Sequence, residues 1–241
     1  MENKTYASAV VRDTVDGGLR SYMLKVYNYM AGGLCLTALT VYFLLRTGLI
    51  AMFFKISENT VMGLSILGWA MFIAPLIMVF MFNSALRNAS LFKVQTMFWL
   101  FSFVMGCSIS PIMILYTGAS VVRVFLISSA TFGAMSLYGY TTKKDLTSMG
   151  SFLIMGLWGV IISSIVNIFM QSSTLYWVIS YVSVAIFVGL TAYDTQKIRS
   201  IYTQRDSEDM LTRKAVAGAL ELYMDFINLF LHLLRIMGDR R

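Results

Sequence analysis

The sequence predicts an all-α integral membrane protein that crosses the bilayer seven times. Of its 241 residues, 58% are hydrophobic and only 13% are charged, whereas soluble domains carry about 25% charged residues. Three long segments contain no charged residue: 59–86, 94–122 and 146–193. About 20 apolar residues are enough to cross a bilayer as a helix, so each segment holds at least one span. Their apolar residues are continuous and do not alternate, which disfavours a transmembrane β-barrel.

Polar interruptions set the limits of the predicted spans. Arg46 ends the first apolar stretch, and the segment TTKKDLTS at 141–148 separates the fourth from the fifth. The last uncharged run is long enough for two spans, and QSST at 171–174 divides it. The seven predicted spans are 26–45, 61–82, 94–116, 124–140, 149–170, 175–193 and 215–234.

The segments outside these spans are short. Residues 1–25 are polar and lack the small-residue cleavage site of a signal peptide, so they are predicted to form an N-terminal tail. The membrane domain then covers 26–235, and 236–241 form a short basic C-terminal tail. The segment 196–214 is predicted to be the only long soluble connection.

The basic residues predict the orientation of the chain. Lys and Arg are enriched in cytoplasmic loops, and with alternating spans 13 of the 19 Lys and Arg lie on the side of the N-terminal tail. We therefore expect a cytoplasmic N-terminus and a cytoplasmic 196–214 connection. The basic C-terminal tail fits the opposite side poorly, so a re-entrant last helix is an alternative interpretation.

Other function classes have little support. The net charge of +7 belongs to loop residues, and no glycine-rich phosphate loop or nucleic-acid motif is present, so no nucleic-acid partner is expected. Cys35 and Cys107 fall inside spans and are expected to pack there. The serines form no nucleophile–base motif, so we do not expect an enzyme, and no cofactor is implied.

The last span carries an unusual polar stripe. Glu221, Asp225, Asn228 and His232 stand at intervals of four, seven and eleven residues from Glu221, which places them on one helical face. Carboxylates at membrane depth are costly, at roughly 2.5–3.5 kcal/mol for an Asp at the centre of a helix. The stripe is therefore expected to face other helices or a polar cavity rather than lipid.

A second carboxylate, Asp194, lies at the end of the sixth predicted span. If it faces Asp225 at a similar depth, the two groups would share a proton and could sense pH or bind a hard cation such as Ca²⁺. Alternatively, Asp194 simply ends its helix at the interface. Glu221 either enlarges the acidic site or sits in headgroup water. His232 is read first as a hydrogen-bonded interface residue and second as a pH sensor.

Arg87 follows the second span and has two interpretations. It is either an anchor at the cytoplasmic interface or an ion-pair partner of one of the carboxylates. The sequence alone favours the anchor.

Four blocks of sequence resemble a known family. They are 108–125 (SISPIMILYTGASVVRVF), 132–167 (FGAMSLYGYTTKKDLTSMGSFLIMGLWGVIISSIVN), 188–198 (VGLTAYDTQKI) and 220–235 (LELYMDFINLFLHLLR). In this order they resemble the Bax inhibitor-1, or transmembrane Bax inhibitor motif, family, and its bacterial branch in particular.

The resemblance implies seven helices with the seventh at the centre, in a bacterial inner membrane. It also implies a pH-dependent calcium leak whose proton sensor matches Asp194 and Asp225, with Arg87 matching an arginine that latches onto the helix-6 aspartate. Two other roles stay open. One is a modulator of a membrane-bound AAA protease, and the other is a proton-coupled transporter of another solute.

Overall fold

The computed structural model describes the backbone of residues 2–57 and 60–241, and the side chains of 17–55, 63–86 and 89–241. It confirms the all-α class with seven helices long and apolar enough to span a membrane. In chain order these are α1 (Glu2–Thr47), α2 (Ile66–Asn88), α3 (Leu91–Ile114), α4 (Gly118–Thr141), α5 (Thr147–Met170), α6 (Ser173–Ser200) and α7 (Glu208–Met237).

Local hydrogen bonds explain where several helices begin. The hydroxyls of Ser65, Thr117, Ser172 and Ser207 each accept a hydrogen bond from the backbone N–H three residues later. These N-caps satisfy donors that the first helical turn leaves free. At 171–174 the chain turns as predicted, with Gln171 in the left-handed conformation (φ 49°) before the Ser172 cap.

The N-terminal end of the membrane domain differs from the prediction. The expected tail at 1–25 is continuous with the first span in one helix, α1, and Tyr22 and Met23 are buried in the core. The first helix therefore begins before residue 26, and the boundary of the membrane domain at residue 25 stays a prediction. Contacts with the core stabilise α1 on the N-terminal side of the residue at which the apolar stretch begins.

A small hairpin also replaces part of the second predicted span. Residues 61–64 belong to strand β2 (Thr60–Leu64), which pairs antiparallel with β1 (Phe54–Ser57) after a short 3-10 helix, η1 (Leu49–Phe53). Helix α2 begins only after Ser65, whose hydroxyl also donates to the Met52 carbonyl at 2.6 Å. A hairpin with strands this short leaves no clear periodic signal in hydropathy.

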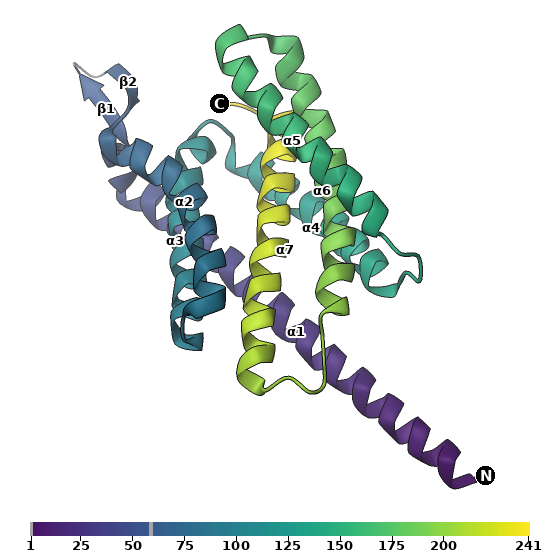
Figure 1. Ribbon diagram of the computed structural model, residues 1–241. Helices are drawn as coiled ribbons and strands as arrows, with labels where there is room; N and C mark the ends of the chain where they lie inside the picture. The colour runs from purple at the N-terminus through teal and green to yellow at the C-terminus, as the bar shows by residue number, and fades with distance from the viewer. Residues whose placement is uncertain (1, 58–59) are drawn as a thin grey trace.

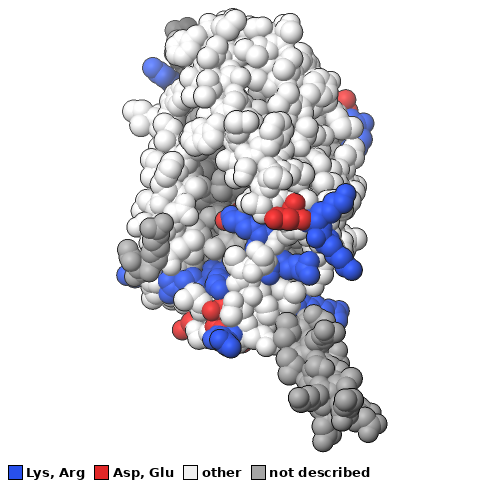
Figure 2. All heavy atoms as spheres, turned by 45° about the vertical axis from the view of Figure 1, so that its right-hand side comes forward, with Lys and Arg blue, Asp and Glu red and all other residues white. Residues whose placement is uncertain are grey.

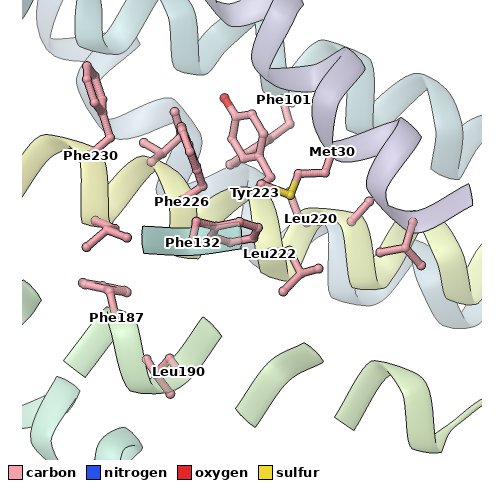
Figure 3. Close-up of a cluster of buried hydrophobic side chains, with 14 of the residues drawn as sticks. Met30, Phe101, Phe132, Phe187, Leu190, Leu220, Leu222, Tyr223, Phe226 and Phe230 are labelled. Carbon is pink, nitrogen blue, oxygen red and sulfur yellow. The ribbon is translucent and has the colours of Figure 1, made fainter. Parts of the chain in front are cut away.

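Helix α7 lies at the centre of the bundle (Figure 1). It packs against α1, α3, α4 and α6, whereas α2 packs mainly on α3, and α5 on α6. Most of its span is buried, and Leu222, Tyr223 and Leu229 are completely enclosed. Figure 3 shows side chains of α1, α3, α4 and α6 gathered around it, among them Met30, Phe101, Phe132 and Phe187.

Glycines allow the outer helices to approach α6 closely. A Cβ atom on Gly139 of α4 would collide with the backbone carbonyl of Ala192, and one on Gly150 of α5 would collide with the ring of Tyr193. Small residues serve this purpose in membrane helices because they let backbones approach. The small-residue content of α4 to α6 is thus used for packing.

Charged residues gather toward one end of the molecule, the end from which α1 projects, and most of the rest of the face in Figure 2 is uncharged. Hydrogen bonds tie several helix ends together there. Arg199 of α6 donates to the carbonyl of Tyr140 at the end of α4, and Lys25 of α1 donates to Thr212 of α7. The C-terminus lies at the opposite end (Figure 1), where the N–H of Arg241 donates to the carbonyl of Leu115.

Helix α7 has no break at which the chain could turn back. It is unbroken over 30 residues, which corresponds to about 45 Å at 1.5 Å per residue. That length exceeds the roughly 30 Å of a bilayer's hydrocarbon core. The helix is therefore long enough to cross a bilayer in a single passage.

Candidate functional site

The polar stripe of α7 faces α6. Helices α6 and α7 run antiparallel, so contacts between them recur every seven residues. The residue number falls along one helix as it rises along the other. His232 stacks on Phe187 with ring centroids 6.1 Å apart, and one heptad along, Asp225 meets Asp194. The stripe lies along the interface of the two helices, where Asp225 is buried and the other three residues are partly exposed.

Asp194 and Asp225 form a pair of carboxyl groups in this interface. They lie within hydrogen-bonding reach of each other. The Asp225 residue is only 6% exposed, and the Asp194 side chain 15%. Oδ2 of Asp225 is buried without a hydrogen-bond partner. Two carboxyl groups can hydrogen-bond only when one of them carries a proton, so this pair is suited to hold a single shared proton.

Asp194 does not end its helix, because α6 continues to Ser200. Its position relative to the membrane interface stays a prediction. The predicted connection 196–214 is wrong, because only residues 201–207 lie between α6 and α7. The extra helical turns keep Asp194 opposite the middle of α7, where Asp225 stands.

An ion pair covers the acidic pair at its charged end. Nζ of Lys197 lies 2.9 and 3.0 Å from the two carboxylate oxygens of Glu221 and 4.0 Å from Oδ1 of Asp194. Glu221 is thus paired with Lys197, and its side chain is 42% exposed. The sequence reasoning missed Lys197, although its i, i+3 spacing from Asp194 was a usable signal.

The other two members of the stripe have separate environments. Asn228 donates from Nδ2 to the Met224 carbonyl of its own helix at 2.9 Å. Nδ1 of His232 is buried without a hydrogen-bond partner, so the expected hydrogen-bonded interface histidine is not what the structure shows. His232 instead presents its ring to Phe187.

Arg87 falls outside the described side chains, although its backbone is part of α2. A different arginine holds this end of α2. Nη1 of Arg213 on α7 donates to the carbonyls of Leu86 at 3.1 Å and Ala89 at 2.7 Å. These carbonyls close the C-terminal turn, where a cation is favourable. Arg213 was not foreseen, because its partners are backbone atoms more than a hundred residues away.

A chain of hydroxyl groups joins three helices beside Asp194. The hydroxyls of Tyr27 on α1 and Ser136 on α4 are 2.7 Å apart, and Ser136 lies 3.0 Å from the hydroxyl of Thr195 on α6. Thr195 also donates to the Thr191 carbonyl. Because Thr195 follows Asp194 directly, this network fixes the rotation of α6 at the acidic pair.

Within the described part of the chain, no group of three or more His, Cys, Asp or Glu converges as a metal-binding cluster. The Asp194–Asp225 pair supplies two carboxyl groups beside a lysine. That is fewer than the six to eight oxygen ligands of a Ca²⁺ site. The donor set does not fit a tightly bound resident metal ion.

The sequence matches a known family over nearly its whole length. The family described as "Inhibitor of apoptosis-promoting Bax1" matches residues 19–241. Inner membrane protein YbhL of Escherichia coli K12 is 41% identical over 226 residues, covering 93% of this chain and 94% of that one. A protein of Rickettsia prowazekii is 42% identical over 238 residues, covering 99% and 98% of the two chains. A membrane protein of Streptococcus pyogenes serotype M1 is 35% identical over 232 residues, covering 95% and 97%.

These matches and the seven membrane-spanning helices agree with each other. The family supports a role as a membrane channel or modulator. The resemblance noted from four blocks of sequence is confirmed. The chain is an integral membrane protein and belongs to the Bax inhibitor-1 family.

Proposed function

We propose that this protein is a pH-responsive cation leak of a bacterial inner membrane, with Ca²⁺ as the permeating ion. One observation carries the proposal: two carboxyl groups, Asp194 and Asp225, meet inside the helical bundle, and one carboxyl oxygen has no partner. The membrane assignment follows the E. coli relative, whose name places it in the inner membrane. The N-terminus is placed in the cytoplasm by the positive-inside bias.

The proton on the carboxyl pair is the proposed switch. With one shared proton the pair holds α6 and α7 together. A second proton removes the remaining negative charge and weakens the attraction to Lys197, which lies 4.0 Å from Asp194. We expect the transition across roughly pH 6–8, because a poorly solvated site favours the uncharged form of a carboxyl group and so favours uptake of the second proton.

Arg87 completes the proposed gate as a latch on Asp194. An arginine stays charged at any working pH, so only the carboxylate can switch. The end of α2 that carries Arg87 is held against α7 by Arg213, which supports an approach of Arg87 to this part of the bundle. Protonation of Asp194 would release the ion pair, and the leak should rise as the pH falls.

Calcium flux into proteoliposomes at stepped pH tests the proposal. The wild-type protein should show flux that changes between pH 6 and 8. Asp225→Asn should abolish that change because the pair can no longer share a proton. Asp209→Asn is the matched control: it makes the same substitution on α7 at an exposed first-turn position, and its profile should equal the wild type. A flat wild-type profile, or equal profiles for the two variants, would reject the acidic pair as the sensor.

A further inference from the structure

An apolar groove runs along the bundle between α1 and α4. Both helices pack on α7 but make little contact with each other among the described residues. Two adjoining cavities of about 600 and 470 Å³ occupy the gap, and both are lined by Leu34, Phe125 and Phe226. Each volume falls in the range of roughly 300–1,000 Å³ typical of small-molecule sites.

The floor of the groove is aromatic and its walls contain small residues. Phe226 of α7 packs edge-to-face with Phe125 at 5.5 Å and with Phe132 at 5.6 Å between ring centroids. On the α4 wall, a Cβ atom at Gly118 or Gly133 would meet nothing within 4 Å. In Figure 3, Phe226 and Phe230 point away from the α7 face that meets Phe187 of α6. The groove is therefore floored by a different face of α7 from the one that meets Phe187.

The length of the groove matches a bilayer. Its α1 wall extends from Arg20 to Leu45, which is about 37 Å at 1.5 Å per residue. A hydrocarbon core is roughly 30 Å thick, so both ends of the groove reach headgroup depth. Arg20 lines one end and Arg241 lines the other. A cation at each end and an apolar path between them is complementary to anionic phospholipids from the two leaflets.

We propose that this groove binds anionic phospholipid, with acyl chains lying between α1 and α4 and phosphate groups at Arg20 in one leaflet and Arg241 in the other. An unfilled groove would leave its walls without dispersion partners, and flexible acyl chains can follow a furrow walled by Gly118 and Gly133. The charge at both ends favours a phosphate-bearing lipid over an apolar helix of a partner protein. Neither Asp194 nor Asp225 lines the groove, although Tyr27 and Ser136 do and are hydrogen-bonded in a chain that reaches Thr195.

Native mass spectrometry of the purified protein tests the proposal, with phosphatidylglycerol as the probe and phosphatidylcholine as its competitor. A Cβ atom at Gly133 meets no protein atom within 4 Å, so Gly133→Leu extends a side chain into the groove, and bound phosphatidylglycerol should fall by roughly fivefold or more. Gly159→Leu is the matched control, since a Cβ atom at this exposed α5 position also meets nothing within 4 Å. It should retain lipid as the wild type does.

Two further variants test the groove and the headgroup preference separately. Ser129→Leu fills the same cavity from another position on α4, so it replaces Gly133→Leu if that variant does not yield a monodisperse protein. Arg20→Gln should reduce the preference for phosphatidylglycerol over phosphatidylcholine while leaving total lipid nearly unchanged. Equal lipid retention by the groove-filling and control variants would overturn the site. The absence of a headgroup preference in the wild type would overturn the anionic lipid.

Discussion

Lys197 of α6 lies between two carboxylates, with Nζ 2.9 Å from Oε1 of Glu221 and 4.0 Å from Oδ1 of Asp194. Its positive charge favours the ionised form of Asp194, whereas Glu221 opposes it. The composition of this small cluster therefore sets the pH at which the acidic pair would change its charge.

Replacing Lys197 should move the pH response of calcium flux. Lys197→Met removes the cation nearest Asp194, so the protonated pair should persist to higher pH. The flux midpoint should rise by roughly half a unit to one unit, since the partly exposed ammonium group is screened by solvent. Glu221→Gln should shift the midpoint in the opposite direction. Lys214→Met, which removes a lysine paired with Asp206 instead, serves as the control, and an unchanged midpoint in Lys197→Met would contradict the coupling.

Variants of Arg87, Asp194 and Arg213 test the proposed latch between Arg87 and Asp194. Arg87→Ala and Asp194→Asn should each raise calcium leak at pH 8, and the double variant should add little, because both changes remove one ion pair. Arg213→Ala removes the hydrogen bonds to the end of α2 but not that ion pair. If Arg87→Ala leaks like the wild type at pH 8, Arg87 is an interface anchor.

The close approach of α4 and α6 should make Gly139 intolerant of a side chain. Gly139→Ala would press its methyl group on the Ala192 carbonyl, and overpacking of this kind costs about 1–3 kcal/mol. Gly133→Ala adds the same group to open space on the same helix, so it should be neutral or slightly stabilising. The midpoint of heat-induced aggregation in detergent, followed by size-exclusion chromatography, checks this. Equal midpoints for the two variants would refute the packing argument.

Asp145 should stabilise the start of α5 without contributing to the pH response. The hydroxyl and N–H of Thr147 donate to its carboxylate at 2.6 and 2.9 Å, which lowers the pKa of Asp145 below its ordinary value of 3.8. The contribution of Asp145 to the free energy of unfolding is therefore complete above the ordinary pKa value and is lost as the pH falls through the lowered pKa. The stability difference between wild type and Asp145→Ala should be constant from pH 6 to 8 and shrink only below about pH 4. A difference that varies between pH 6 and 8 would show that another group titrates there.

Cysteine accessibility in a background without Cys35 and Cys107 tests the orientation. A cysteine at Arg205, in the exposed turn between α6 and α7, should react with an impermeant reagent only after the membrane is opened. A cysteine at Lys55, at the opposite end, should react in intact spheroplasts. The reverse pattern would invert the topology. Arg205 is preferable to Ser207, since the Ser207 hydroxyl caps α7.

The position of the proposed site depends on the tertiary structure. The sequence shows Asp194 near the end of an apolar run, but its distance from Asp225 depends on how far α6 continues. The helix extends to Ser200 because its late charged residues find partners on other elements, Lys197 with Glu221 and Arg199 with the Tyr140 carbonyl. Such contacts stabilise a polar turn that composition alone would assign to a loop.

By itself, the sequence determined the number of spans, the break near Gln171 and the polar face of α7. These features depend on hydropathy and helical period, which act over a few neighbouring residues. Only the tertiary structure decided that α1 begins before the apolar stretch, that β1 and β2 precede α2, that Arg213 holds the end of α2, and that α1 and α4 leave a groove. The hairpin depends on pairing between two neighbouring short segments, and the other features depend on contacts between residues far apart in the chain. The energies of these contacts are set by packing and by the pairing of polar groups.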